Sequence, residues 1–176
     1  MWSSPDFTAL LPYIHTILNQ AGCRDFLVFD IDDTVLNGMG DGVTPVEPGL
    51  ELVREAESRN LGVYYVTARP EFPRNRLQTY DDLKKVGIHD PALVIMRPLN
   101  VTSWDEIGRF KKRSRSMIGN IHGGKCVLTV GDKWTDMLTV DEAQMDNLNH
   151  TIGDKYSLFQ FVDTTGWGLK LRENII

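Results

Sequence analysis

Residues 26–36 read FLVFDIDDTVL, and this stretch decides the fold. Its first four residues form a short apolar run, which predicts a buried strand. The run ends in Asp30, Asp32 and Asp33. In open α/β sheets, ligands bind at the carboxyl ends of the strands. A functional site is therefore expected where this strand ends.

Strand and helix signals alternate on both sides of this stretch. Apolar runs predict further strands at residues 63–66, 92–96, 126–130 and 158–162. Helices are predicted at residues 7–21 (interrupted by Pro12), 48–60, 73–86, from Ser103 onward and around 135–145. Residues 37–48 are rich in glycine and proline, so they predict a loop or tight hairpin. The alternation predicts one α/β domain over residues 1–176, with a mostly parallel, five-stranded central sheet and helices on both faces.

Length, composition and charge are those of an ordinary soluble domain. The chain has 176 residues, 41% hydrophobic and 24% charged, with a net charge of −5. This charge disfavours broad binding to nucleic acid or anionic membranes, although Lys111, Lys112, Arg113 and Arg115 form a local basic patch. No run approaches 18 apolar residues and no signal peptide is apparent, so a cytoplasmic protein without a membrane span is expected.

Polar residues also follow two other predicted strands. Thr67 follows residues 63–66, and Asp132 follows residues 126–130. Carboxylates from two strands suit a hard cation such as Mg²⁺. Asp30 could attack phosphorus, while Asp32 could protonate the leaving group and then activate water. Each residue alone is also compatible with a polar turn, but their joint occurrence at strand ends favours a site.

Four segments resemble the motifs of the haloacid dehalogenase (HAD) superfamily. They are DIDDTVL (30–36), VTARP (66–70), FK followed by Arg115 and Ile118 (110–118), and VGDKWTD (130–136). Their variants, with LVIMRP at 93–98, are similar to the plant and bacterial class B branch of acid phosphatases. Each motif is weak alone, but four in order are specific. The resemblance covers about residues 26–140 and implies a Rossmann-like HAD core.

The resemblance implies a role for each matching carboxylate. Asp30 would be the nucleophile and Asp32 the acid/base. Mg²⁺ would be held by Asp30, the backbone carbonyl of Asp32, and Asp132. Asp136 would lie in the metal shell or just behind it.

The resemblance also implies which residues hold the phosphoryl group. Thr67 and the amide of Ala68 would cradle the phosphate, and Lys111 would hold phosphate and nucleophile. Arg69 is a weaker candidate for a substrate contact. Arg115 is expected to contact substrate, to lie behind the site, or to form a plain salt bridge.

The short intervals between motifs leave no room for a large cap domain. One loop, one helix and one strand fill the interval from Asp30 to Thr67, and similar elements fill that from Thr67 to Lys111. An open site is therefore expected. It would accept a bulky phosphomonoester such as a protein or nucleic-acid end, or a small one if a homo-oligomer supplied the missing walls.

Two alternatives remain beside a phosphomonoester hydrolase. A polynucleotide 3′- or 5′-end phosphatase is slightly favoured by the basic patch and slightly disfavoured by the net charge. A non-catalytic storage or interaction protein on a HAD scaffold is disfavoured because Asp30, Asp32, Lys111 and Asp132 are all present.

Overall fold

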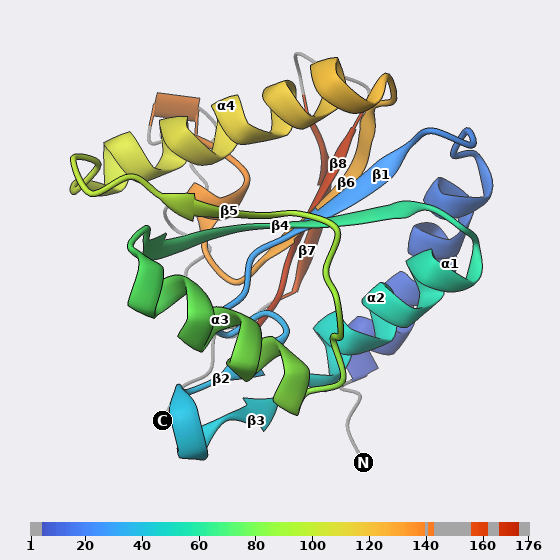
Figure 1. Ribbon diagram of the computed structural model, residues 1–176. Coiled ribbons are helices and arrows are strands. Elements are labelled where there is room, and N and C mark those ends of the chain that lie inside the picture. The colour runs from blue at the N-terminus through green and yellow to red at the C-terminus, as the bar shows by residue number, and fades with distance from the viewer. Residues whose placement is uncertain (1–4, 140, 143–155, 162–165, 173–176) are drawn as a thin grey trace.

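The computed structural model describes residues 5–139, 141–142, 156–161 and 166–172. Its centre is a six-stranded sheet in the order β5-β4-β1-β6-β8-β7 (Figure 1). The strands are β1 (Phe26–Phe29), β4 (Gly62–Pro70), β5 (Val94–Arg97), β6 (Cys126–Gly131), β7 (Ser157–Gln160) and β8 (Trp167–Lys170). Neighbouring strands are parallel, except that β7 runs antiparallel to β8. The predicted mostly parallel α/β sheet is confirmed.

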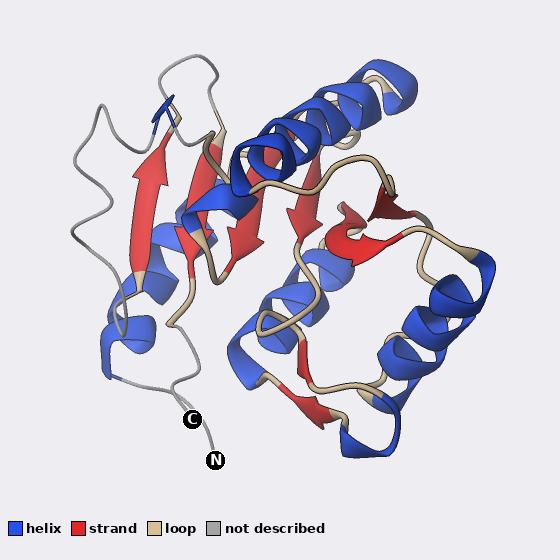
Figure 2. Ribbon diagram, turned by 90° about the vertical axis from the view of Figure 1, so that its left-hand side faces the viewer, coloured by secondary structure: helices blue, strands red, loops and turns tan. Residues whose placement is uncertain are grey.

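Helices cover both faces of the sheet. They are α1 (Pro5–Asn19), α2 (Glu47–Ser58), α3 (Pro73–Lys85) and α4 (Trp104–His122). Helix α4 crosses one face, and the other three helices lie on the opposite side (Figures 1 and 2). Helix α1 continues through Pro12, and α4 begins at the predicted capping box of Ser103 and Glu106. No helix in the described ranges is both long and apolar enough to cross a membrane.

Strand β1 is buried on both faces, and its side chains alternate between two cores. Leu27 and Phe29 belong to the core shared with α1 and α2, whereas Phe26 and Val28 belong to the core beneath α4. Full burial of a side chain of this size contributes about 1.5–3 kcal/mol. Both cores therefore hold the strand that ends at Asp30.

The sheet has one strand more than the five predicted. Strand β8 lies between β6 and β7 and was missed because its sequence, WGLK, contains no continuous apolar run. Gly168 lets the ring of Phe159 on β7 pack close to β8, because a Cβ at this position would lie 2.5 Å from that ring. The strand predicted at residues 158–162 corresponds to β7.

The short helix predicted around residues 135–145 also differs from the structure. Residues Trp134–Asp136 form one 3₁₀ turn, η2, and residues 137–139 are not helical. The side chain of Asp136 accepts the backbone N–H groups of Asp132 and Lys133, which stabilises a tight turn instead of an α-helix. Asp141 and Glu142 are helical, as predicted, and residues 140 and 143–145 lie outside the described residues.

The glycine-rich loop forms a small hairpin. Strands β2 (Leu36–Asn37) and β3 (Thr44–Pro45) pair antiparallel around a 3₁₀ turn, η1 (Gly40–Gly42). We call residues 36–45 the hairpin. Within the described part of the chain it is the only insertion after β1, and no cap domain is present there.

The turn after β1 is packed tightly against the start of α2. A Cβ on Gly49 would overlap with the carbonyl oxygen of Thr34. We therefore expect Gly49→Ala to lower the unfolding free energy by about 1–3 kcal/mol, a drop in Tm of roughly 2–12 °C. Thermal unfolding followed by circular dichroism measures it.

Gly42→Ala is the matched control, because a Cβ on Gly42 meets no atom within 4 Å. Its Tm should stay within about 2 °C of wild type. Equal Tm values for the two variants would contradict the close packing of α2 against the turn.

Candidate active site

Three buried carboxylates meet at the carboxyl ends of β1 and β6. They belong to Asp30, Asp132 and Asp136, and an oxygen of each lies within 4.8 Å of the others. The backbone of Asp30 is fixed because its N–H donates to the carbonyl of Val130 on β6, at 2.9 Å. The structure therefore brings Asp30 together with Asp132 and Asp136, two predicted site residues that lie about 100 positions further along the chain.

Lys111 reaches into this cluster from α4. Its Nζ lies 2.7 Å from Asp30 Oδ1 and 2.5 Å from Asp136 Oδ1, and its side chain is only 3% exposed. Burial alone would lower the pKa of Lys111, but the charges of Asp136 and Asp30 outweigh burial and raise it. The side chain is thus a fixed cation beside the predicted nucleophile.

The cluster holds more negative charge than Lys111 offsets. Burial, followed by the charge of Asp136, raises the pKa of Asp132 to about 9 and that of Asp30 to about 7. Lys133 lies 3.5 Å from Asp132, but its side chain is 45% exposed and so screened by water. Buried carboxylates that are hard to ionise are the donor set that suits a hard divalent cation.

Asp136 occupies a supporting position in this cluster. Both its oxygens already accept hydrogen bonds, from Lys111 on one side and from the N–H groups of Asp132 and Lys133 on the other. Gly131 allows the close approach, because a Cβ there would overlap with the side chain of Asp136. Asp30 also accepts on both oxygens, but its second hydrogen bond, from Thr34 Oγ1, is long at 3.4 Å. Asp30 and Asp132 are therefore the better-placed cation ligands, with Asp136 behind them.

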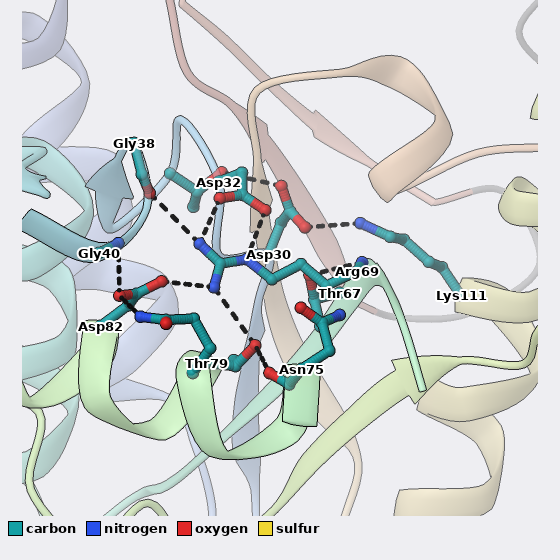
Figure 3. Close-up of polar contacts among 12 residues, drawn as sticks. Asp30, Asp32, Gly38, Gly40, Thr67, Arg69, Asn75, Thr79, Asp82 and Lys111 are labelled. Carbon is teal, nitrogen blue, oxygen red and sulfur yellow. Dashed lines mark hydrogen bonds and ion pairs between the residues drawn. The ribbon is translucent and has the colours of Figure 1, made fainter. Parts of the chain in front are cut away.

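Asp32 lies two residues beyond Asp30, but its side chain binds Arg69 and not Lys111. Its oxygens accept a two-pronged hydrogen bond from Arg69, with Nε and NH2 at 2.9 and 2.8 Å (Figure 3). The Asp32 side chain is 45% exposed, so its carboxylate is held from behind while remaining open to solvent. Its side chain does not join the carboxylate cluster, which leaves its backbone carbonyl as the predicted metal contact.

Strand β4 brings Thr67 and Ala68 to the same edge of the sheet. Thr67 is fully buried, and its Oγ1 accepts the backbone N–H of Arg69 at 3.1 Å. An accepting hydroxyl keeps its own hydrogen for donation. The carbonyl of Ala68 accepts from Arg97 Nε at 2.7 Å, which fixes this irregular end of β4.

The two candidate arginines are both occupied by the protein. Arg69 is buried between Asp32 and Asp82, as described below. Arg115 donates to the carbonyls of Asp136 and Met137, each at 2.8 Å, and its guanidinium stacks over the ring of Phe161. Arg115 thus supports the turn that carries Asp136, because its guanidinium donates hydrogen bonds to two carbonyls of that turn.

Sequence inspection missed Asp82, which is fully buried on α3 and paired with Arg69. The sequence does contain a sign of a polar inner helix face, because Asn75, Thr79 and Asp82 recur at helical spacing. In the structure all three are buried. A polar stripe on the inner face of a helix needs buried partners, because unpaired buried polar groups are costly.

Comparisons with known proteins identify the family of the chain. Residues 40–158 match the sequence profile of the HAD superfamily, subfamily IIIB (acid phosphatase). This segment contains Thr67, Lys111, Asp132 and Asp136, whereas Asp30 and Asp32 precede it. No curated protein sequence matches the chain.

A solved structure has the same fold. The class C acid phosphatase from Bacillus anthracis, crystallised with tungstate bound, superposes with a TM-score of 0.64. The match covers 96% of this chain and 75% of that one, at 13% sequence identity. Since the family profile matches well over half of the sequence, the chain belongs to the acid phosphatases of HAD subfamily IIIB and is a phosphoric monoester hydrolase.

Proposed function

We propose that the chain is a Mg²⁺-dependent phosphatase that works through a covalent aspartyl-phosphate on Asp30. The observation that supports this most is the contact between Asp30 and Lys111, inside the cluster with Asp132 and Asp136. A carboxylate fixed at the end of a central strand, beside a buried cation, is placed to act as a nucleophile.

The carboxylate cluster fits Mg²⁺ by its chemistry. Asp30 and Asp132 would hold the ion, with the backbone carbonyl of Asp32 as a further oxygen ligand and Asp136 behind them. When bound, the ion would offset the repulsion between these carboxylates and a phosphate dianion. Lys111 contributes the remaining positive charge near Asp30.

The first half of the reaction transfers the phosphoryl group to Asp30. An Asp30 oxygen forms a bond to phosphorus while the bond from phosphorus to the ester oxygen breaks. The departing oxygen takes a proton from Asp32, so that it leaves as an alcohol. Thr67 and Lys111 would hold the phosphoryl oxygens during this transfer.

The second half hydrolyses the aspartyl-phosphate. Asp32, now ionised, takes a proton from a water molecule, whose oxygen bonds to phosphorus while the bond to Asp30 breaks. Phosphate is released, and Asp32 is protonated again. The half-exposed position of Asp32 supports this role, since the same carboxyl must meet both the leaving group and water.

The basic patch that slightly favoured a polynucleotide-end phosphatase is divided in the fold. Lys111 is buried in the site, Lys112 pairs with Glu142 at 3.0 Å, and Arg115 is bonded to backbone carbonyls. Lys111 and Arg115 therefore do not belong to an exposed patch, whereas Lys112 and the exposed Arg113 still lie together on the outer side of α4. We propose a phosphomonoester without a polynucleotide chain as the substrate.

Replacing the nucleophile tests the mechanism. Asp30→Asn keeps the size of the side chain but removes the attacking oxygen anion, so kcat on an aryl phosphate with Mg²⁺ should fall by roughly 10³-fold or more. Asp105→Asn, which removes an exposed partner of Arg109 on α4, is the control and should stay within about twofold of wild type. Near-wild-type turnover by Asp30→Asn would exclude the aspartyl-phosphate.

The raised carboxyl pKa values predict how pH and metal affect stability. Without metal, the folded state holds protons on Asp132 up to about pH 9 and on Asp30 up to about pH 7, whereas both ordinarily titrate near 3.8. The folded state therefore binds more protons than the unfolded state within this window, so the contribution of these groups to stability falls as pH rises.

Added Mg²⁺ should reverse this trend by favouring the ionised carboxylates. We expect Mg²⁺ to raise Tm in EDTA-treated protein by several degrees at about pH 8 and by much less at about pH 5. In Asp132→Asn, the Mg²⁺ effect should largely disappear. A Mg²⁺ effect of equal size at both pH values, or one that survives in Asp132→Asn, would contradict the assignment of the ion to this cluster.

A further inference from the structure

Arg69 links two carboxylates of very different exposure. Its NH2 lies 2.8 Å from Oδ1 of Asp32, which is half-exposed at the site, and its NH1 lies 2.8 Å from Oδ2 of Asp82, which is fully buried on α3. NH1 also donates to Thr79 Oγ1 at 3.2 Å. Figure 3 shows the guanidinium lying between the two carboxylates.

The buried carboxylate keeps Arg69 in place. Asp82 accepts from Arg69, from the backbone N–H of Gly40 at 3.0 Å and from Gln78 Nε2 at 2.8 Å. Removing one partner from a buried ion pair leaves an uncompensated charge, which is strongly destabilising. Arg69 therefore cannot turn away to bind a substrate anion without abandoning Asp82.

The same residues hold the hairpin. Asp82 accepts the N–H of Gly40, Arg69 lies 3.4 Å from the carbonyl of Gly38, and Lys85 donates to the carbonyl of Gly40 at 2.5 Å. Gly38 has a φ of +80°, and a Cβ there would lie 2.6 Å from the carbonyl oxygen of Gly42. One buried ion pair thus fixes both Asp32 and the loop beside it.

We propose that Asp82 is a positioning residue for proton transfer, acting through Arg69 on the carboxyl of Asp32. Arg69 spans both carboxylates with three donors in fixed geometry, so the place of Asp82 in α3 sets the orientation of Asp32. This inference rests on the proposed role of Asp32 as general acid. It also reassigns Arg69 from substrate contact to support of the acid.

The test compares two leaving groups in Asp82→Asn. An alkyl phosphate releases a poor leaving group that needs a proton, whereas 4-nitrophenyl phosphate releases a good one that does not. The ratio kcat/KM covers only the steps up to formation of the aspartyl-phosphate, so it reports the acid and not the later activation of water. We expect kcat/KM to fall roughly 10- to 100-fold for the alkyl phosphate and less than about threefold for the aryl phosphate.

Two reference variants are compared with Asp82→Asn, one expected to show the selective loss and one expected to show none. Asp32→Asn should give the same selective loss in larger measure, and Asp81→Asn, an exposed neighbour with the same change of charge, should give none. An equal loss of kcat/KM for both substrates in Asp82→Asn, or no loss, would overturn the proposal, because a purely structural defect does not distinguish leaving groups.

Arg69→Lys covers the case in which Asp82→Asn does not fold. Lysine keeps the charge but cannot engage both oxygens of Asp32 together with Asp82, so the same selective loss is expected. An even loss would overturn the proposal here as well. Failure of the proposed function is separate: it would appear as an inactive wild type or an active Asp30→Asn, whichever way the Asp82 variant behaves.

Discussion

The structure depends on burying negative charge where β1 and β6 end. Asp30, Asp132 and Asp136 are each less than a tenth exposed and lie within contact of one another. Such a cluster is destabilising unless cations compensate it, because burial and mutual repulsion both oppose ionisation. Lys111 supplies one charge from α4, which explains why this helix packs with a buried lysine on its inner face. The cores on both sides of β1 supply the burial energy that holds the arrangement together.

A second ion pair, between Arg69 and the half-exposed Asp32, keeps the predicted acid apart from this cluster. Asp32 is only two residues from Asp30, yet its carboxylate pairs with Arg69 and not with Lys111. The two predicted catalytic carboxyls therefore sit in different electrostatic surroundings. One is surrounded by other carboxylates and a lysine, and the other is open to solvent and held by an arginine. Two roles for two neighbouring carboxyls require such a difference in environment.

The sequence predicted the elements whose signals are local. Strand β1, the capping box at Ser103 and the polar ends of β4 and β6 can each be recognised within a few residues. Strand β8 could not be recognised in this way, because its four residues form a strand only through their pairing with β6 and β7. The partners of Arg69 and Arg115 could not be predicted either. A charged side chain carries no local sign of whether it meets a substrate, a buried carboxylate or a backbone carbonyl, and here both arginines meet protein groups.

Arg69 and Arg115 are both bound to protein groups, so neither is available to balance the charge of a phosphate. Of the cationic side chains proposed to face the phosphoryl group, Lys111 remains, and it already neutralises part of the charge of Asp30 and Asp136. A phosphate dianion entering beside these carboxylates would add repulsion that one lysine cannot offset. The proposed divalent cation would supply that charge at the same place, because the oxygen donors of Asp30 and Asp132 are suited to hold it. The proposed divalent cation is thus supported by where Arg69 and Arg115 are fixed as well as by the carboxylates themselves.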